Sequence, residues 1–218
     1  MSVIFSTTQT SANTLNTPYT GSAIQPITVM AWIFTSEVGT PATYRDIVTA
    51  DPNLYMQLWS DGTSIDYGTQ HNDHVGPSLL ANTWYHTCEV VVPTSTTSRQ
   101  IYGYLNGQLV VNVADTDTSV TYTAICVGNS IFSSYVYPFN GWIRDVRVWT
   151  RQLTATEIVD EMLNKRSVHK QGLYVESPLD DNNYADLSGN NNLFTNGSAV
   201  TIGSGNIHAF AKKRRSFP

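Results

Sequence analysis

The sequence predicts an all-β fold in which antiparallel strands pack as a sandwich or a barrel. Segments rich in Val, Ile, Tyr and Trp recur along the chain and are divided by turn residues such as Gly, Pro, Asn and Asp. Charged residues occupy 13% of the 218 positions, about half of the usual ~25%, which excludes a long helical or coiled-coil protein. No stretch approaches the ~20 apolar residues of a membrane-spanning helix, so no membrane insertion is expected, and the length suits one domain.

The predicted strands are short and are separated by recognisable turns. The clearest pair is a hairpin around Asn106 and Gly107, because this dipeptide accepts the positive φ angles of a type I′ turn. The predicted strands, in chain order, are residues 27–34, 46–50, 54–59, 84–92, 101–105, 108–113, 122–127 and 141–149.

One short helix is predicted directly after Leu153. Thr154 and Glu157 have the spacing of a capping box, in which each side chain accepts a hydrogen bond from the backbone N–H of the other residue. The carboxylates of Glu157, Asp160 and Glu161 are expected on the solvated face of this helix.

Four motifs then follow one another in a fixed order. They are residues 81–86 (ANTWYH), 104–109 (YLNGQL), 139–149 (FNGWIRDVRVW) and 153–158 (LTATEI). This series resembles the laminin G-like, concanavalin A-like jelly-roll domains, which occur in secreted proteins and in structural proteins of phages. The resemblance covers about residues 1–165 and implies an antiparallel β-sandwich of the jelly-roll type.

The chain after the helix resembles a further part of the same family. Residues 173–180 and 186–192 are similar to a segment that commonly precedes the rest of these domains, whereas here it follows them. The remaining chain is too short for another core, although a second module cut short is the alternative. We therefore expect residues 173–210 to supply closing strands to a single domain, residues 1–210, and residues 211–218 to form a basic tail.

Two positions depart from the family pattern, and the strand at residues 141–149 is expected to contain a β-bulge. Arg144 and Glu89 stand where the family usually has an Asp and an apolar residue. Ile143 and Val146 are both expected to face the core, yet residues three apart on a regular strand lie on opposite faces. A β-bulge near Arg144 and Asp145 would bring both side chains to one face.

The charge is unevenly distributed along the chain. Four of the 12 basic residues stand together near the end, and the other 8, with 17 acidic residues, leave the body a formal charge of −9. An acidic body is a poor binder of nucleic acid, so we expect no such partner. The cluster is predicted to anchor the chain to protein subunits of a larger assembly or to another copy; a solvated or nucleic-acid-seeking end is the alternative. This assembly tail consists of Lys212, Lys213, Arg214 and Arg215.

The cysteines and two histidines raise the question of disulfides and metals. Cys88 and Cys126 lie in predicted strands, where buried free thiols are expected and one disulfide between adjacent strands is the alternative. His71 and His74 lie within four loop residues, with Asp73 between them, and could ligate zinc. A complete metal site would need ligands from elsewhere, and polar loop residues commonly serve solubility alone.

Catalysis has little support in the sequence, and we expect a protein that is not an enzyme. Glucanases of the concanavalin A-like architecture carry a Glu-x-Asp-x-x-Glu signature on one strand, and no such motif occurs here. The chain also has no Gly-rich phosphate loop and no Gly-x-Ser-x-Gly elbow.

Ligand binding is predicted for aromatic residues that flank turns at the rim of the sandwich. Exposed rings present flat apolar faces that stack on sugars or on another protein, although each ring could equally fill the core. The candidates are Trp59, Tyr67, Tyr135 and Tyr137.

Calcium is the one cofactor that the resemblance raises, because many domains of this type hold Ca²⁺ at the rim with Asp side chains and backbone carbonyls. The hard oxygens of a loop suit this ion, and turn formation by Asp and Asn is the alternative. The candidate ligands are Asp180, Asp181, Asp186 and Asn190.

The sequence is compatible with two classes of function. The first is a structural and recognition protein on the surface of a larger assembly, with capsid decoration on a virion as the natural case. The chain begins at Met1 with no basic start or apolar run, so no secretory signal is expected, and it consists almost entirely of one module. The alternative is a glycan-binding, lectin-like module of an extracellular protein.

Overall fold

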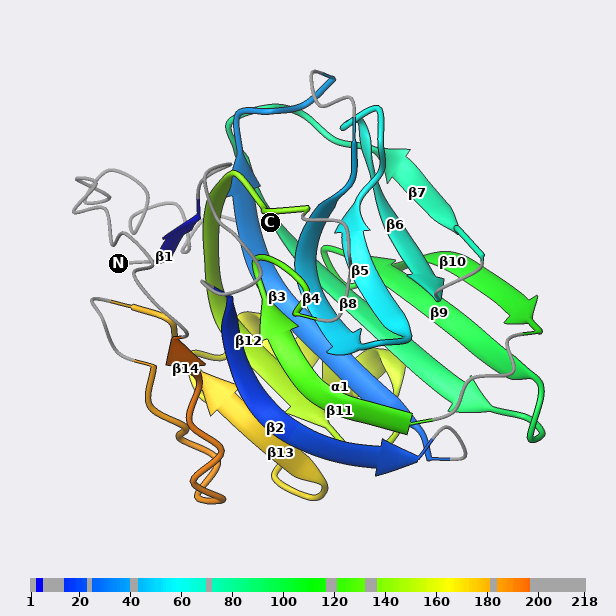
Figure 1. Cartoon of the computed structure of the whole chain (residues 1–218), viewed down its shortest axis with the longest axis vertical. Helices are drawn as coiled ribbons and strands as arrows, with labels where there is room; N and C mark the ends of the chain where they lie inside the picture. Colours follow the sequence, from blue (N-terminus) through cyan, green and yellow to red (C-terminus); the bar gives the residue numbers. More distant parts are fainter. Residues whose placement is uncertain are drawn as a thin grey trace.

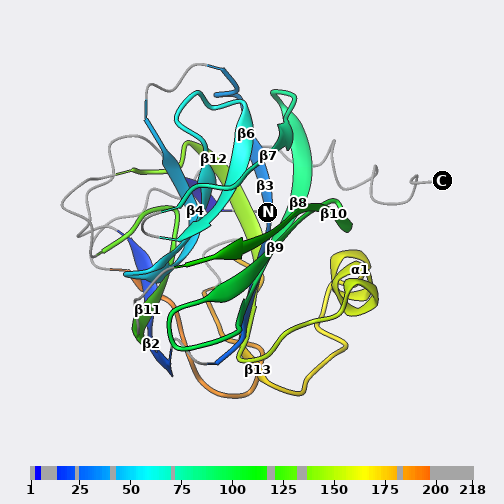
Figure 2. The ribbon, with the colours of Figure 1, turned by 90° about the vertical axis from the view of Figure 1, so that its right-hand side faces the viewer.

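Two antiparallel sheets packed face to face, with one helix against the outer face of sheet A, make up the described part of the chain (Figure 1). Figure 2 shows the layers side on, with sheet B, sheet A and the helix following one another across the view. The computed structural model describes residues 3–5, 14–22, 25–39, 43–69, 72–116, 121–131, 137–180 and 184–196. The predicted antiparallel β-sandwich is confirmed.

Within the described residues, each sheet has seven strands. Sheet A contains, in order, β1 (Val3–Phe5), β12 (Gly141–Trp149), β3 (Ile27–Thr35), β8 (Thr83–Pro93), β9 (Arg99–Leu105) and β10 (Gln108–Asp115), and β13 (Leu173–Ser177) pairs with β12. Sheet B contains, in order, β14 (Thr195–Asn196), β2 (Leu15–Ser22), β11 (Thr121–Val127), β4 (Arg45–Asp51), β5 (Leu54–Leu58), β6 (Ser64–Thr69) and β7 (Val75–Ser78).

The main core lies between the sheets and consists of side chains at alternate strand positions. Val29 and Ile33 from sheet A and Val48 and Met56 from sheet B are all fully buried there. The residues between them point to the outer faces, because successive side chains on a strand alternate. This alternation decides which residues of sheet B are available to a ligand.

The predicted bulge in β12 is confirmed. Its pairing with β3 shifts register between Arg144 and Arg147, and Asp145 has a φ of 51°. The extra residue brings both Ile143 and Val146 into the core, where each is 0% exposed. The Asn106-Gly107 hairpin is confirmed as well, with φ values of 50° and 79°.

Helix α1 (Ala155–Leu163) begins with the predicted capping box between Thr154 and Glu157. The expectation that Glu161 lies on a solvated face is wrong, because its side chain is buried against sheet A and ion-pairs with Arg147 at 2.6 Å. The helix covers part of the outer face of sheet A through a second apolar cluster that includes Trp149 and Ile158.

The cysteines are buried free thiols, as predicted. Cys88 belongs to β8 in sheet A and Cys126 to β11 in sheet B, so they are not on adjacent strands. Burial is the main cause that raises the pKa of each thiol above its ordinary value. Neither side chain is therefore placed for thiolate chemistry.

The segment after the helix adds one strand to each sheet. β13 pairs with β12, and β14 pairs with β2 through Thr195 and Asn196. The predicted limit of the domain at residue 210 and the basic tail at 211–218 lie outside the described residues and stay predictions.

Candidate functional site

Three aromatic side chains from different segments meet at one end of sheet B. Tyr44 precedes β4, Trp59 follows β5, and Tyr137 lies in the connection between β11 and β12. The Tyr44 ring packs edge to face against both others, with centroid distances of 5.4 Å to Trp59 and 5.5 Å to Tyr137. All three rings are half-buried. We call Tyr44, Trp59 and Tyr137 the rim aromatic cluster.

Strand pairing explains why the cluster forms. Asp46 of β4 pairs with Gln57 of β5, so the residues just beyond these positions, Tyr44 and Trp59, leave the hairpin side by side. Tyr137 reaches the same place because its carbonyl accepts a hydrogen bond of 2.8 Å from the N–H of Asp46. Each ring is therefore held by the backbone next to it.

A polar row lies beside the cluster on the outer face of sheet B. Asp46, Gln57 and Asp66 are cross-strand neighbours, and the Gln57 amide donates to Asp66 at 2.9 Å. All three side chains are buried. Burial, and next the nearby Asp51, raise the pKa of Asp46 well above its usual range.

Asp66 has the same kind of environment. Burial raises the pKa of Asp66 to about 7, although hydrogen bonds from the Gln57 amide and the His74 N–H act in the opposite direction. Nearby Asp73 adds to the rise. The polar row thus favours protonated, uncharged carboxyls.

Two loop segments cover this row. Ser130 and the N–H of Ile131 donate to Asp51 at 2.7 and 2.8 Å, which holds the start of the β11–β12 connection over sheet B. The N–H of His74 donates to Asp66 at 2.7 Å on the other side. The half-buried rings of the rim aromatic cluster lie at the surface beside these two loop segments.

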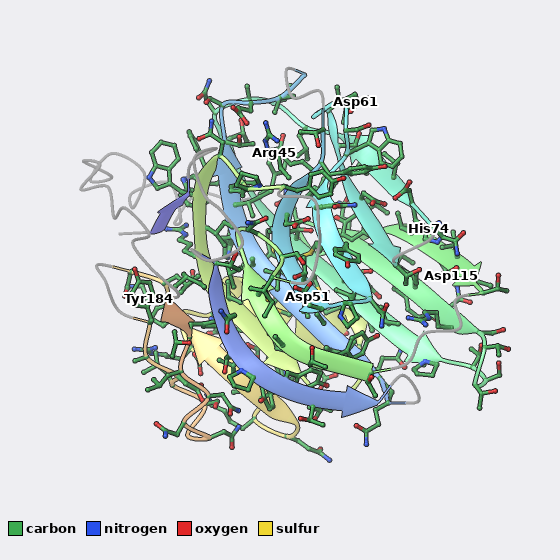
Figure 3. The ribbon with its side chains drawn as sticks, viewed as in Figure 1. Arg45, Asp51, Asp61, His74, Asp115 and Tyr184 are labelled. Carbon is green, nitrogen blue, oxygen red and sulfur yellow. The ribbon has the colours of Figure 1, made fainter. Side chains whose placement is uncertain are left out.

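One exposed carboxylate, that of Asp73, contacts the cluster, and a second, that of Asp61, lies two residues beyond Trp59 and accepts hydrogen bonds from Thr63. The Tyr44 hydroxyl donates to Asp73 at 3.3 Å, and burial together with this carboxylate raises the pKa of Tyr44 to about 12. Asp61 is exposed in the turn after Trp59 (Figure 3). The cluster therefore combines aromatic faces with carboxylate acceptors.

An ion pair fixes the strand next to Tyr44. Arg45 donates from Nε to Glu37 at 3.3 Å, and the Asn140 amide donates to the other oxygen of Glu37 at 2.6 Å. These contacts join three segments at the base of the cluster, so the rings are positioned before any ligand arrives.

The structure brings together two of the predicted aromatic ligand residues, Trp59 and Tyr137. The prediction that Tyr67 lies at the rim is wrong: it is 0% exposed, faces the core, and donates its hydroxyl hydrogen to the Tyr104 carbonyl at 3.0 Å. Tyr135 lies outside the described residues. Tyr44, at the centre of the cluster, was missed, although its place opposite Trp59 in a predicted hairpin could have revealed it.

The predicted calcium ligands do not come together as a cation site among the residues described. Asp186 accepts hydrogen bonds from the N–H groups of Glu176, Ser188 and Asn192, which lower its pKa against the effect of burial. The Asn190 amide donates to the Leu173 carbonyl at 2.7 Å. Both side chains therefore stabilise their loop.

The remaining metal candidates are only partly described. Asp180 is half-buried, whereas Asp181 and His71 lie outside the described residues, as do Lys212, Lys213, Arg214 and Arg215. Within the described ranges, no group of three or more His, Cys, Asp or Glu side chains is arranged to hold a metal ion. None of the helices described is long and apolar enough to cross a membrane.

Solved structures share this fold at low sequence identity. A proposed carbohydrate-binding protein from Bacteroides ovatus ATCC 8483 has a TM-score of 0.64 and 16% identity over 93% of this chain and 60% of its own. A mutant Trypanosoma rangeli sialidase with trans-sialidase activity has a TM-score of 0.51 and 12% identity over 68% of this chain and 28% of its own. The chain thus spans less than two thirds of the length of each, and these similarities show a common fold.

The family is identified by sequence comparison. No curated protein matches it. The profile of the Concanavalin A-like lectin/glucanases superfamily matches residues 7–159, more than half of the chain, and includes both strands that flank the rim aromatic cluster. The chain therefore belongs to the Concanavalin A-like lectin/glucanases superfamily.

Proposed function

We propose that this protein is a non-catalytic carbohydrate-binding module that recognises glycans through the rim aromatic cluster. The observation that carries the proposal is the meeting of Tyr44, Trp59 and Tyr137 beside exposed Asp61 and Asp73. Half-buried rings stack on the C–H face of a sugar, and carboxylates accept hydrogen bonds from its hydroxyl groups.

The charges around the cluster favour neutral or amino sugars. Asp61 and Asp73 are exposed, and the rest of the described chain holds more acidic than basic residues. Like charges placed together at a binding surface oppose association, so sialic and uronic acids are disfavoured ligands. The proposed carbohydrate binding of the Bacteroides ovatus protein supports the same class of ligand.

The acids near the cluster support binding rather than hydrolysis. A glycosidase needs two carboxyl groups on opposite sides of an accessible sugar bond. Asp46 and Asp66 are both 0% exposed beneath the two loop segments, and Asp61 and Asp73 are exposed in loops. We infer that a bound oligosaccharide is released intact.

The test begins with a glycan array that includes neutral, amino and sialylated oligosaccharides, followed by calorimetric titration of the strongest ligand. Trp59→Ala is expected to weaken binding by about tenfold or more, because it removes a stacking ring. Tyr102→Ala serves as the matched control, since Tyr102 is a half-buried aromatic residue on sheet A. Equal affinity in wild type and Trp59→Ala, or a strict preference for sialylated glycans, would contradict the proposal.

Attachment to a virion or to another large assembly stays a prediction from the sequence. The basic tail that would mediate it lies outside the described residues. Glycan recognition and such attachment are compatible, because the rim aromatic cluster and the tail are different parts of the chain.

A further inference from the structure

A second candidate site lies at the edge of sheet B formed by β2 and β14, away from the rim aromatic cluster. A pocket of about 520 Å³ opens between β2, Tyr174 of β13 and the loop that leads to β14. Its volume is within the ~300–1,000 Å³ typical of small-molecule sites. The lining residues are Thr17, Pro18, Thr20, Tyr174, Asn191, Asn192, Leu193 and Thr195.

The pocket exists because β14 covers only part of β2. Thr195 pairs with Asn16 and Asn196 with Leu15, and no strand in the described ranges continues this pairing along Thr17–Thr20. Tyr174 closes the far side by donating its hydroxyl hydrogen to the Pro18 carbonyl. Its ring is fixed edge to face against Tyr19 at a centroid distance of 4.8 Å.

The loop that forms the other wall is rigidly built. The Asp186 carboxylate accepts hydrogen bonds from the backbone N–H groups of Glu176 and Asn192, with N···O distances of 3.0 and 2.8 Å. The Asn190 and Asn192 amides both donate to the Tyr174 carbonyl, at 3.1 and 2.8 Å. The pocket is therefore preorganised, which limits the entropy lost when a ligand binds.

The polar side chains open to the pocket are those of Thr20, Asn191 and Thr195, all three of which are exposed. Asn191 has a φ of 61°. The Thr17 hydroxyl is instead buried on the core face of β2, the same face as Leu15, so Thr17 lines the pocket without offering its hydroxyl to a ligand.

We propose that this pocket binds a short neutral saccharide. Amides and hydroxyls match sugar hydroxyl groups, while Tyr174, Pro18 and Leu193 supply apolar contact. Among the described residues, no charged side chain lines the pocket, so the described lining offers an ionic ligand no counter-charge. The site is independent of the rim aromatic cluster: β11 separates β2 from β4, and Tyr44 lies about seven residues, roughly 20 Å, along the strands from the level of Pro18.

The test is an amide NMR titration of the full ¹⁵N-labelled chain with methyl glycosides of neutral hexoses and, separately, with sialic acid. Saturable shifts are expected at Thr17, Thr20 and residues 191–195 with a neutral glycoside and not with sialic acid. Asn191→Gly keeps the positive φ and is expected to weaken this binding about five- to tenfold by removing one amide. Asn82→Gly is the matched control, since Asn82 is also exposed with a φ of 57°.

The outcomes separate this pocket from the proposed function. Trp59→Ala is expected to leave the pocket shifts unchanged, and their persistence alongside lost array binding would support the pocket while contradicting the rim site. Shifts confined to Tyr44, Trp59 and Tyr137 would overturn the pocket and leave the rim site standing. Unchanged affinity in Asn191→Gly, or protection of the β2 edge by an extended peptide but by no glycoside, would also overturn it.

Discussion

Replacing Glu161 with alanine is expected to lower the free energy of unfolding by about 3–5 kcal/mol. Arg147 donates from Nη1 to the Glu161 carboxylate at 2.6 Å, and the two side chains are 3% and 0% exposed. The other carboxylate oxygen accepts from the N–H groups of Val168 and His169, at 2.9 and 2.8 Å. The substitution removes the only carboxylate paired with this buried guanidinium in the described residues, although the guanidinium keeps the carbonyls of Glu161 and Asn164, and it leaves the two N–H groups without their acceptor.

Chemical denaturation of Glu161→Ala and of Asp160→Ala measures this effect. Asp160 is the preceding residue on the same helix, with a side chain 48% exposed, so its substitution is expected to cost below about 1 kcal/mol. A loss of similar small size in both variants would show that the buried ion pair does not hold α1 against sheet A.

The stability of the fold is expected to fall as the pH rises from about 4 to 8, in part because of Asp66. In the folded protein, burial raises the pKa of Asp66 from 3.8 to about 7. Between these two values the folded state holds a proton that the unfolded state has released, so rising pH favours unfolding. The full shift corresponds to as much as roughly 4 kcal/mol.

Asp66→Asn is the variant that isolates this contribution. The asparagine side-chain oxygen still accepts from the His74 N–H. The Gln57 amide can rotate by 180° so that its oxygen accepts from the NH₂ group of the new asparagine. Compared with wild type, the variant is expected to gain stability at pH 8 and little at pH 4, as measured by denaturation at both values. Asp46 is present in both proteins and cancels in the comparison. Burial and next the Asp66 carboxylate raise the pKa of Glu89, and the variant removes that carboxylate, so the contribution of Glu89 adds to the expected gain at high pH. If the variant and wild type differed in free energy of unfolding by the same amount at pH 4 and pH 8, the raised pKa of Asp66 would be contradicted.

The sequence predicts the architecture well because the strands of sheet A carry strong local signals. β3 is buried along its whole length and is therefore apolar and β-branched almost throughout. The Asn106-Gly107 turn and the Thr154 capping box depend on a few neighbouring residues, which the sequence displays directly. The bulge in β12 follows from the spacing of Ile143 and Val146 alone.

Sheet B is harder to predict, because three of its strands carry residues that disfavour strands. β2 contains Pro18, β6 contains Asp66 and Gly68, and β7 contains Pro77. These segments are stabilised by pairing with strands that are distant in sequence, and the pattern of neighbouring residues does not reveal that pairing. The error at Tyr67 has this origin: once β6 is recognised as a strand, alternation with Ile65 places its ring in the core.

The candidate site depends on the same long-range contacts. Trp59 and Tyr137 were selected as turn aromatics, but the contact of both with Tyr44 depends on the β4–β5 hairpin and on the return of the β11–β12 connection beside Asp46. Glu161 shows the opposite case, since a carboxylate on a short helix normally faces solvent. Its burial depends on Arg147, which the bulge in β12 directs toward the helix.

Glycan recognition at the rim aromatic cluster is tested most directly by the tryptophan indole N–H signals. The chain has five tryptophans, and one of them, Trp59, belongs to the cluster. Trp59→Phe assigns its signal in the ¹H–¹⁵N spectrum of the full chain, which is then titrated with the oligosaccharide selected on the array. We predict a saturable shift of the Trp59 indole signal while that of Trp149, buried behind α1, stays fixed. An unmoved Trp59 signal at saturating oligosaccharide, or a shift confined to Trp84 and Trp142 on sheet A, would contradict the proposed site.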